Sequence, residues 1–275
     1  MTRNFAVVTD STADLPDEWR QRYGIEVVPL KVLFGKETFR DRVDMTDEEF
    51  FRRLAASSTL PTTSAPSPGE FAEVYKRLAA DYQGCISIHI GAQLSATAEA
   101  ARVGASSVDR FPVKVVDSET VSMPIAFLCR IAAECSSLDE AYAAVTERVA
   151  KTRVLALLDT LRYLEMGGRL SRAQAMIGTM LDLKPLLLVA DREIKPVDRV
   201  RTRSRAMTRM VEFFEGEGPV EHVAVMHAQA PEDAQRIAAE LRAKSPEREV
   251  TVGQIGCVLG THTGPRALGI VYLKA

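Results

Sequence analysis

The feature that most constrains the fold of this chain is an alternation of short apolar runs with longer helical segments. Runs such as Phe5–Thr9 and Cys85–Ile90 have the length and the composition of buried strands. Each is followed by a stretch with apolar residues at helical spacing, which is typical of a mostly parallel sheet covered by helices. The sequence therefore predicts an α/β protein.

The rhythm changes near Arg153, and we expect two α/β domains. The chain has 275 residues, against about 100–200 for a typical domain. Residues 1–152 are expected to form an N-terminal, mostly parallel sheet flanked by helices. Residues 153–275 contain a predicted hairpin, made by 186–189 and 193–197, and are expected to form a mixed sheet with helices.

Four segments carry expectations about local structure that matter for function. Ile25–Val32 is predicted to be one strand, followed by a hairpin over residues 34–39. Ser57–Gly69 is predicted to be a long loop, and loops of that length are uncommon unless they are functional. Leu94–Ser107 is predicted to be a helix. Gly256–Pro265 is rich in glycine and threonine and is expected to be a loop between strands.

Composition and charge exclude several classes of protein. With 46% hydrophobic and 26% charged residues the chain is neither fibrous nor disordered. A net charge of −2 provides no sequence-wide basic field, so we expect no nucleic-acid binding and at most transient membrane contact. We find no signal-peptide pattern, no run of 18 apolar residues and no CxxC pair. A cytoplasmic protein with reduced thiols and no metal site is expected.

Polar side chains follow the first expected strand, in Thr9–Asp14. The carboxyl ends of strands face the ligand crevice in open α/β sheets, so this place in the chain favours a functional role. The simpler interpretation of Asp14 is a helix N-cap, because Leu15-Pro16 comes directly after it.

Hydroxyl side chains precede two further helices. Ser67 followed by Pro68 fits a helix cap, and His89 is interpreted as a buried core histidine. Ser95 lies near a helix start, where its hydroxyl and the helix dipole can attract an anion. Three more hydroxyls are not needed for capping and can hold a carboxylate or phosphate: Thr62, Thr63 and Ser64.

Two segments of the second half also carry candidate site residues. Gly167-Gly168 can end a helix with positive φ, and Arg169 then stands at a corner suited to bidentate capture of a carboxylate or phosphate. A structural salt bridge explains Arg169 equally well. His262 lies among glycines and threonines, which core packing explains poorly. We find no GxxxxGK[ST], GxGxxG, GxSxG or HExxH motif, which disfavours ATP chemistry within this chain.

Taken together, these segments resemble the bacterial DegV family over essentially the whole chain. The resemblance rests on motifs in a fixed order: Thr9–Leu15, Val28-Pro29-Leu30, Thr63-Ser64 with Pro66–Gly69, Leu94-Ser95 with Thr97, Asp117-Ser118, Gly167-Gly168-Arg169, and His262–Pro265 with Leu268-Gly269. The family is similar to the acyl-binding subunit of the bacterial fatty acid kinase. That likeness implies a binding protein rather than an enzyme, with a long-chain fatty acid in a tunnel between two α/β domains.

The resemblance also implies roles for individual residues and a partner. Thr63, Ser95 and His262 would bind the fatty-acid carboxylate, and Arg169 would be the cationic group beside it. The bound fatty acid would be the ligand and no cofactor would be needed. A separate kinase subunit, resembling dihydroxyacetone kinase, would supply ATP and form the acyl phosphate. Further pocket residues would be Thr62, Ser64, Gly91, Ala92, Thr97 and Thr263.

Other parts of the site are predicted from the residues. Methionines adapt to a flexible chain, so a helix of the second half is a candidate for the wall around the acyl tail, although plain core explains its spacing as well. Its residues are Met176, Ile177, Met180 and Leu181. The basic stretch Arg199–Arg205 is either a surface for the kinase subunit or a solvated loop and helix face.

Four positions depart from the family pattern, and they leave the shape of the anion pocket and the kinase partnership open. They are Gly91, Ala92, Ala96 and Arg266. The main alternative function is a serine-dependent hydrolase or transferase on a small acyl or phosphorylated substrate, using Ser95 or Ser11 with His262. A sensor that reports its lipid occupancy to another protein would use the same pocket.

Overall fold

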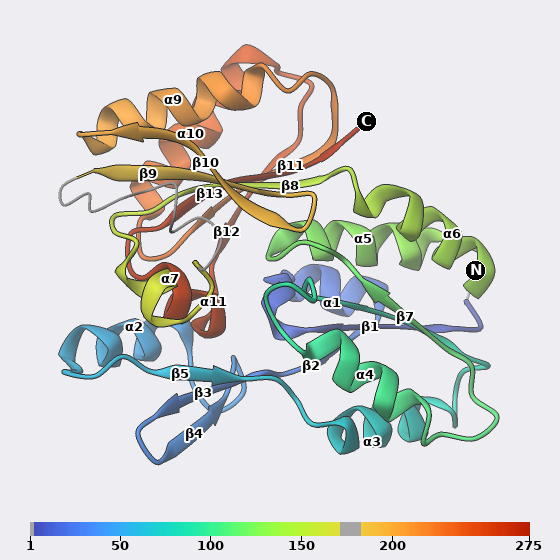
Figure 1. The fold of residues 1–275 in the computed structure, drawn as a ribbon. Coiled ribbons are helices and arrows are strands. Elements are labelled where there is room, and N and C mark those ends of the chain that lie inside the picture. The colour runs from blue at the N-terminus through green and yellow to red at the C-terminus, as the bar shows by residue number, and fades with distance from the viewer. Residues whose placement is uncertain (1–2, 171–182) are drawn as a thin grey trace.

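The structure is a computed structural model that describes residues 3–170 and 183–275, and it confirms the predicted α/β class. In these residues the strands form three sheets (Figure 1). The first sheet is parallel and has the order β2-β1-β6-β7, as the sequence predicts. Its strands are β1 (Ala6–Asp10), β2 (Ile25–Val28), β6 (Cys85–His89) and β7 (Val113–Asp117).

Helices cover both faces of this parallel sheet, because its central strands are apolar on both sides. On one face, Ala6 and Val8 of β1 pack with Phe71 and Tyr75 of α3, and α4 lies beside α3. On the other face lie α5 and α6, with α1 at the β2 edge (Figure 1). The helices are α1 (Asp17–Tyr23), α3 (Pro68–Leu78), α4 (Thr97–Ala105), α5 (Met123–Glu134) and α6 (Leu138–Val149).

The second sheet is mixed, as expected, with the strand order β10-β9-β8-β13-β11-β12. Strand β13 runs antiparallel to both of its neighbours, whereas β11 and β12 are parallel. Helices α9 and α10 cover one face, and α5 packs against the other, so that α5 lies between the two large sheets. The elements are β8 (Thr152–Leu157), β9 (Lys184–Ala190), β10 (Glu193–Val200), β11 (Val220–His227), β12 (Val250–Gln254), β13 (Leu268–Lys274), α9 (Arg203–Glu215) and α10 (Pro231–Lys244).

The third sheet is small and antiparallel, with the order β4-β3-β5. It contains the predicted hairpin, now β3 and β4. The short helix α11 packs against this sheet, against α2 and against α7. The elements are η1 (Ser11–Ala13), β3 (Lys31–Phe34), β4 (Glu37–Arg40), α2 (Asp47–Ala56), β5 (Thr62–Ser64), α7 (Arg162–Met166) and α11 (Cys257–Thr263).

The predicted single strand over Ile25–Val32 is wrong, because the chain divides it between two sheets. Strand β2 ends at Val28 and β3 begins at Lys31. Pro29 between them has no N–H to continue a ladder. The N–H of Leu30 donates instead to Ser11 Oγ at 3.1 Å, which fixes the crossing point beside η1.

The segment Ser57–Gly69, expected to be a loop, contains strand β5. Its three residues pair with β3, with Leu33 opposite Thr62 and Lys31 opposite Ser64. The flanking prolines and serines suggest a loop, and three residues are too few for a strand pattern to show in the sequence. The predicted cap is confirmed, since Ser67 and Glu70 form a capping box at the start of α3.

Two segments differ from their predicted secondary structure. Gly256–Pro265 is not a loop, because Cys257–Thr263 forms α11. Its glycine permits a close helix contact: a Cβ at Gly260 would lie 2.8 Å from the rings of Phe50 and Phe51. In the predicted helix Leu94–Ser107, residues 94–96 form a turn, and α4 begins at Thr97.

Two further observations concern the cysteines and the helices of the described residues. All four cysteines are free, and three of them are buried. Within residues 3–170 and 183–275 no helix has the length and the apolar character needed to span a membrane.

The close packing of α3 on α4 predicts opposite effects for two glycine substitutions. In Gly104→Ala the new Cβ would lie 2.6 Å from the Pro68 carbonyl oxygen, and overpacking of about 1–3 kcal/mol outweighs a gain in helix propensity of about 1 kcal/mol. Gly69→Ala meets only Ser67 Oγ at 3.9 Å, so it should be neutral or stabilising. Urea unfolding of both variants measures the difference; a Gly104→Ala protein as stable as wild type would contradict the packing.

Candidate ligand-binding site

An apolar pocket lies where the six-stranded sheet meets the loops of the parallel sheet. Both halves of the chain supply its walls, and helix α11 covers one side. Its apolar lining is Leu30, Ile90, Leu94, Val121, Val154, Ala156, Leu158, Leu164, Leu187, Val189, Ile194, Val258 and Leu259. Its polar lining is Thr63, Ser95, Arg169, His262 and Thr263. The four residues predicted to bind a carboxylate therefore share one pocket.

The apolar wall comes from one face of strands β8, β9 and β10. Val154 of β8 pairs with Val189 of β9, and Val189 pairs in turn with Ile194 of β10. The next row joins Ala156 to Leu187. Alternate residues of a strand share a face, so the register places these side chains together on the face opposite α9. The wall is a continuous apolar strip of sheet.

Strand β5 and helix α11 form the polar end of the pocket. Thr63 Oγ1 lies 2.9 Å from His262 Nε2, which joins the two elements. Thr263 also lines the pocket, but its hydroxyl donates to the Leu259 carbonyl at 3.0 Å. The outward-facing Thr62 and Ser64 are exposed and do not line the pocket.

The imidazole of His262 is held neutral. Burial, and secondly the nearby Arg169, lower its pKa from 6.5 to about 4. Its Nδ1 is buried against Gly167 and has no hydrogen-bond partner within the described residues. At neutral pH the ring therefore carries one N–H and can donate or accept, but it adds no charge.

Arg169 supplies the positive charge at this end. Helix α7 ends at Met166 with Gly167 as its C-cap, and Gly168, with φ of 71°, then turns the chain so that Arg169 follows at the corner, as predicted. Its guanidinium donates from Nε to the Leu94 carbonyl at 3.1 Å and from Nη1 to the Gly167 carbonyl at 2.6 Å. No carboxylate among residues 3–170 and 183–275 forms a salt bridge with it. The structural salt bridge considered from sequence is thus not seen there, and the charge is open to an anionic ligand.

Ser95 reaches the pocket from the turn before α4. Its hydroxyl is 2.8 Å from Thr97 Oγ1, and Thr97 itself is buried and does not line the pocket. Ala96 is the N-cap residue and offers no side-chain cap. Gly91 and Ala92 also lie outside the lining, since their N–H groups donate to the Thr120 carbonyl and to Asp117 Oδ1. Gly91 belongs to the turn that supports Ser95, since the Ser95 N–H donates to the Gly91 carbonyl.

The predicted acyl-tail residues Met176, Ile177, Met180 and Leu181 lie outside the described residues. Among the residues that the structure does describe, the apolar wall comes instead from β8, β9 and β10. Sequence analysis missed these strands as pocket residues. Strands β8 and β9 are apolar on both faces, so no alternation marks which face would meet a ligand.

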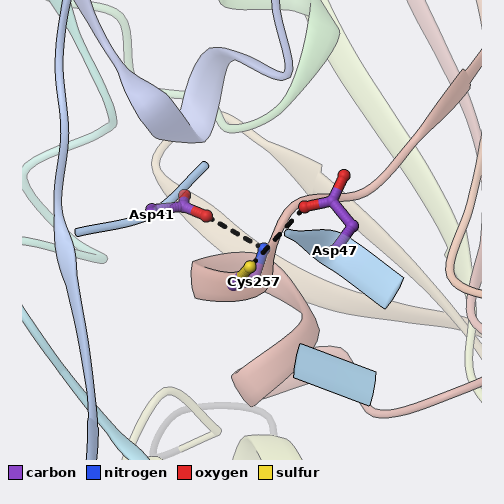
Figure 2. A group of neighbouring side chains, drawn as sticks. All are labelled: Asp41, Asp47 and Cys257. Atoms are coloured by element: carbon purple, nitrogen blue, oxygen red, sulfur yellow. Dashed lines mark hydrogen bonds between the residues drawn. The ribbon is translucent and has the colours of Figure 1, made fainter. Parts of the chain in front are cut away.

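A second group of side chains surrounds the first turn of α11 (Figure 2). Asp41 Oδ1 accepts a hydrogen bond from the Cys257 N–H at 3.1 Å, and the Cys257 thiol is 3.6 Å from Asp47 Oδ1. Ligand-type atoms of these three residues lie within 4.8 Å of one another. Arg42 binds Asp47 at 3.0 Å, so the group already contains a cation. We assign no metal ion to it.

Asp14 belongs to the same region, and its interpretation as a helix N-cap is wrong. Helix α1 begins at Asp17 after Pro16, without a side-chain cap. The Asp14 carboxylate instead accepts hydrogen bonds from the Gly256 N–H at 2.9 Å and from Ser122 Oγ at 2.6 Å. Partners 108 and 242 residues away in the chain leave no local sequence signal.

A Ser–His–Asp series is present in the core of the parallel sheet. His89 Nε2 is 2.6 Å from Ser87 Oγ, and His89 Nδ1 is 3.0 Å from Asp10 Oδ2. All three side chains are completely buried, and none of them lines the pocket. The hydroxyl of Tyr75 also bonds Ser87. The series is a satisfied buried network, and the interpretation of His89 as a core histidine is confirmed.

Comparisons with known proteins agree with this fold over the whole chain. The family model described as "Uncharacterised protein, DegV family" matches residues 4–275. A DegV domain-containing protein of Streptomyces coelicolor is 39% identical over 280 residues, covering 98% of this chain and 99% of that protein. The solved structure of DegV from Bacillus subtilis, described as a fatty acid binding protein, has a TM-score of 0.91 at 36% identity with full coverage of both chains. A DegV family protein of Thermus thermophilus, described by its fatty acid binding, has a TM-score of 0.91 at 30% identity, covering 99% of this chain and 100% of that one.

Fold and site together define an α/β protein whose apolar pocket ends in hydroxyls, a neutral histidine and an arginine without a carboxylate partner in the described chain. The matches to the family model and to the full-length relatives assign the class more narrowly. The chain belongs to the DegV family, which confirms the resemblance inferred from its motifs.

The environment of His262 predicts an unusual titration. NMR of the histidine side chains should show His262 protonating near pH 4, because burial disfavours the imidazolium. Arg169→Gln should raise the pKa of His262 but leave it below 6.5, since burial is the larger cause. A value near 6.5 in the wild-type protein would mean that the ring is solvated.

Proposed function

We propose that this protein binds one long-chain fatty acid in the apolar pocket, with the carboxylate at the polar end. The observation that carries the proposal is the apolar-walled pocket that holds Arg169, which has no carboxylate partner in the described residues, beside Thr63, Ser95 and His262. An anion with a long apolar tail fits both the apolar wall and the polar end of the pocket. The full-length likeness to the Bacillus subtilis and Thermus thermophilus proteins, both described by fatty acid binding, supports the same ligand.

The tail provides the driving force for binding. Burying about 15 methylenes at about 0.8 kcal/mol each gives roughly 12 kcal/mol before the costs of ordering the chain. The tail would lie along the strip of β8, β9 and β10 that carries Ala156 and Val189. The head group then has only to avoid the penalty of a buried unpaired charge, which is several kcal/mol.

The polar end satisfies the carboxylate through three kinds of donor. With its proton on Nε2, His262 donates to Thr63 Oγ1, and the Thr63 hydroxyl is then free to donate to a carboxylate oxygen. Ser95 adds a second hydroxyl. Arg169 adds a nearby positive charge while its Nε and Nη1 are held by carbonyl groups.

We further propose that the protein is a carrier and that a separate kinase of the dihydroxyacetone-kinase type forms the acyl phosphate. Two geometric facts favour a carrier over a serine hydrolase. The Ser95 hydroxyl pairs with Thr97, and His262 pairs with Thr63, so neither is arranged as nucleophile and base. Ser11 accepts a hydrogen bond from the Leu30 N–H and does not line the pocket.

The same proposal covers the organisation and place of the protein. Residues 1–152 and 153–275 are the two domains, and the fatty acid is held between them. In this proposal the exposed part of Arg199–Arg205 faces the kinase. Arg203 is half-buried and binds Asp159 and Asp233. The free, mostly buried cysteines suit a cytoplasmic location.

Extraction of the purified protein with organic solvent, followed by mass spectrometry, tests the ligand. We expect about one fatty acid per chain, and Thr63→Ala should lower that occupancy several-fold, because a buried carboxylate loses a charge-assisted hydrogen bond of about 1.5–3 kcal/mol. Thr62→Ala is the matched control, since Thr62 points out of the pocket on the same strand. An empty extract, together with no binding of added oleate or palmitate, would overturn the proposed function.

Substitution of Arg169 separates binding from transfer. Arg169→Ala should reduce acyl phosphate formation by the kinase more than fatty acid binding, because the tail supplies most of the affinity whereas the positive charge lies at the reacting carboxylate. Titration with oleate measures fatty acid binding, and a phosphorylation assay with the kinase subunit measures acyl phosphate formation. Equal losses in both would make Arg169 a simple counter-ion.

A further inference from the structure

Helix α11 connects the two halves of the molecule at the polar end of the pocket. It lies between β12 and β13 in the chain, yet it packs against η1, α2, β3 and β5 of the first half. Its last turn carries His262, and its first turn follows Gly256. At about 1.5 Å per residue, Gly256 and His262 are about 9 Å apart along the helix axis. A shift of the first turn is therefore passed directly to His262.

The first turn of α11 is capped by carboxylates from the first half. Gly256, the N-cap residue, has no side chain to offer. Asp14 accepts from the N–H of Gly256, and Asp41 accepts from the N–H of Cys257. Asp14 also holds Ser122, the residue before α5, so one fully buried carboxyl group ties three elements together.

Backbone strain is concentrated at this junction. Asp14, Arg42 and Ser122 are non-glycine residues with φ of 47°, 56° and 66°. All three converge at the start of α11, where Arg42 Nη2 donates to the Gln254 carbonyl at 2.8 Å and lies 3.5 Å from Asp14 Oδ1. Such conformations cost free energy and persist only where the surrounding contacts fix them. The contacts of Asp14 and Arg42 at the start of α11 therefore hold this junction in a conformation that costs free energy, and weakening one of these contacts favours its opening.

The charges at the junction do not balance when every group is ionised. In the described residues Arg42 forms salt bridges with Asp14 and with Asp47 but none with Asp41. Asp41 Oδ2 is buried without a hydrogen-bond partner there. The Cys257 thiol faces Asp41 and Asp47, and burial raises its pKa, so the thiol stays neutral and adds no further negative charge. A neutral carboxyl group relieves this imbalance.

Asp14 is the carboxyl group of this junction whose protonation state changes near neutral pH. Burial raises its pKa from 3.8 to about 7, and Asp41 adds to the rise, whereas Arg42, Ser122 and the Gly256 N–H oppose it. A carboxyl group whose pKa is higher in the closed junction than in water favours the closed junction when protonated. That contribution is full below 3.8, the ordinary pKa, is lost progressively as the pH rises to about 7, and changes little above that pH.

We propose that Asp14 is a positioning residue for the fatty acid site, whose neutral carboxyl holds α11 and His262 against Thr63 and whose ionisation loosens α11 and weakens fatty acid binding. The inference rests on the proposed function, because the ligand whose affinity changes is the fatty acid. The affected residues line the pocket: Val258, Leu259 and His262 all lie on α11.

The test compares Asp14→Asn with the wild-type protein, using Asp17→Asn as control. Asparagine tolerates the left-handed conformation at Asp14 and keeps an oxygen for the Gly256 N–H, but it cannot ionise. Asp17 is an exposed carboxylate three residues away. Affinity for cis-parinaric acid, a fluorescent fatty acid, is measured from about two pH units below to about one unit above 7, because burial raises the pKa of Asp14 to about 7.

The ratio of the Asp14→Asn affinity to the wild-type affinity should rise with pH up to about 7, by at most about tenfold per pH unit, and should level off above that pH. The difference between the thermal midpoints of Asp14→Asn and wild type should rise over the same range. Asp17→Asn should show neither difference. A ratio of affinities that does not change with pH, or the same change in Asp17→Asn, overturns the proposal.

Amide hydrogen exchange of α11 separates failure of this inference from failure of the proposed function. In ligand-free protein above pH 7, the Gly260 N–H, which donates to the Gly256 carbonyl at 2.8 Å, should exchange more slowly in Asp14→Asn than in wild type. If cis-parinaric acid binds at no pH, the proposed ligand is wrong, and slower exchange would still support the hold of Asp14 on α11. Equal exchange in the two proteins would reject it.

Discussion

The hydrogen bond between Thr63 and His262 is the contact on which the pocket depends, because it joins segments 199 residues apart and closes the polar end. Neither partner reaches this place through local structure alone. Thr63 is brought in by the short pairing of β5 with β3, and β3 leaves the parallel sheet at Pro29. His262 is brought in by α11, which packs on α2 and is capped from η1 and from Asp41. The site is thus made by long-range contacts between small elements, while the two large sheets supply the frame.

The large sheets explain why the pocket is apolar and why it can remain in a folded protein. Strands β8 and β9 are apolar on both faces: Leu155 and Leu186 pack under α9, whereas Val154 and Val189 face the pocket. A wall of this kind is energetically part of the core, and a hydrocarbon tail would extend the core without a new polar contact. The polar groups are confined to the end formed by β5, α11, the turn before α4 and the corner after α7.

How much was predictable follows from how local each signal is. The parallel strands, the β3–β4 hairpin, the cap at Ser67 and the buried His89 were predictable, because period, turn chemistry and capping act within a few residues. Thr63, Ser95, Arg169 and His262 were found as candidates because hydroxyls, a corner arginine and a loop-like histidine are hard to explain by packing. Strand β5, helix α11 and the partners of Asp14 were missed or misjudged, since their reasons lie across the fold. The pocket wall was missed because strands buried on both faces show no alternation.

The polar end also sets what kind of ligand the proposed function selects. Arg169 already gives two of its donors to backbone carbonyls, and His262 is neutral. The polar end of the pocket therefore compensates the negative charge of a carboxylate but does not bind it through a bidentate ion pair. A small carboxylate would gain only a few charge-assisted hydrogen bonds of about 1.5–3 kcal/mol each, and the cost of burying its charge, several kcal/mol, offsets them. Each methylene of a long tail adds about 0.8 kcal/mol through burial, and a long tail has many of them. Selection therefore falls on the tail, and the head group serves to place a carboxylate beside the positive charge of Arg169.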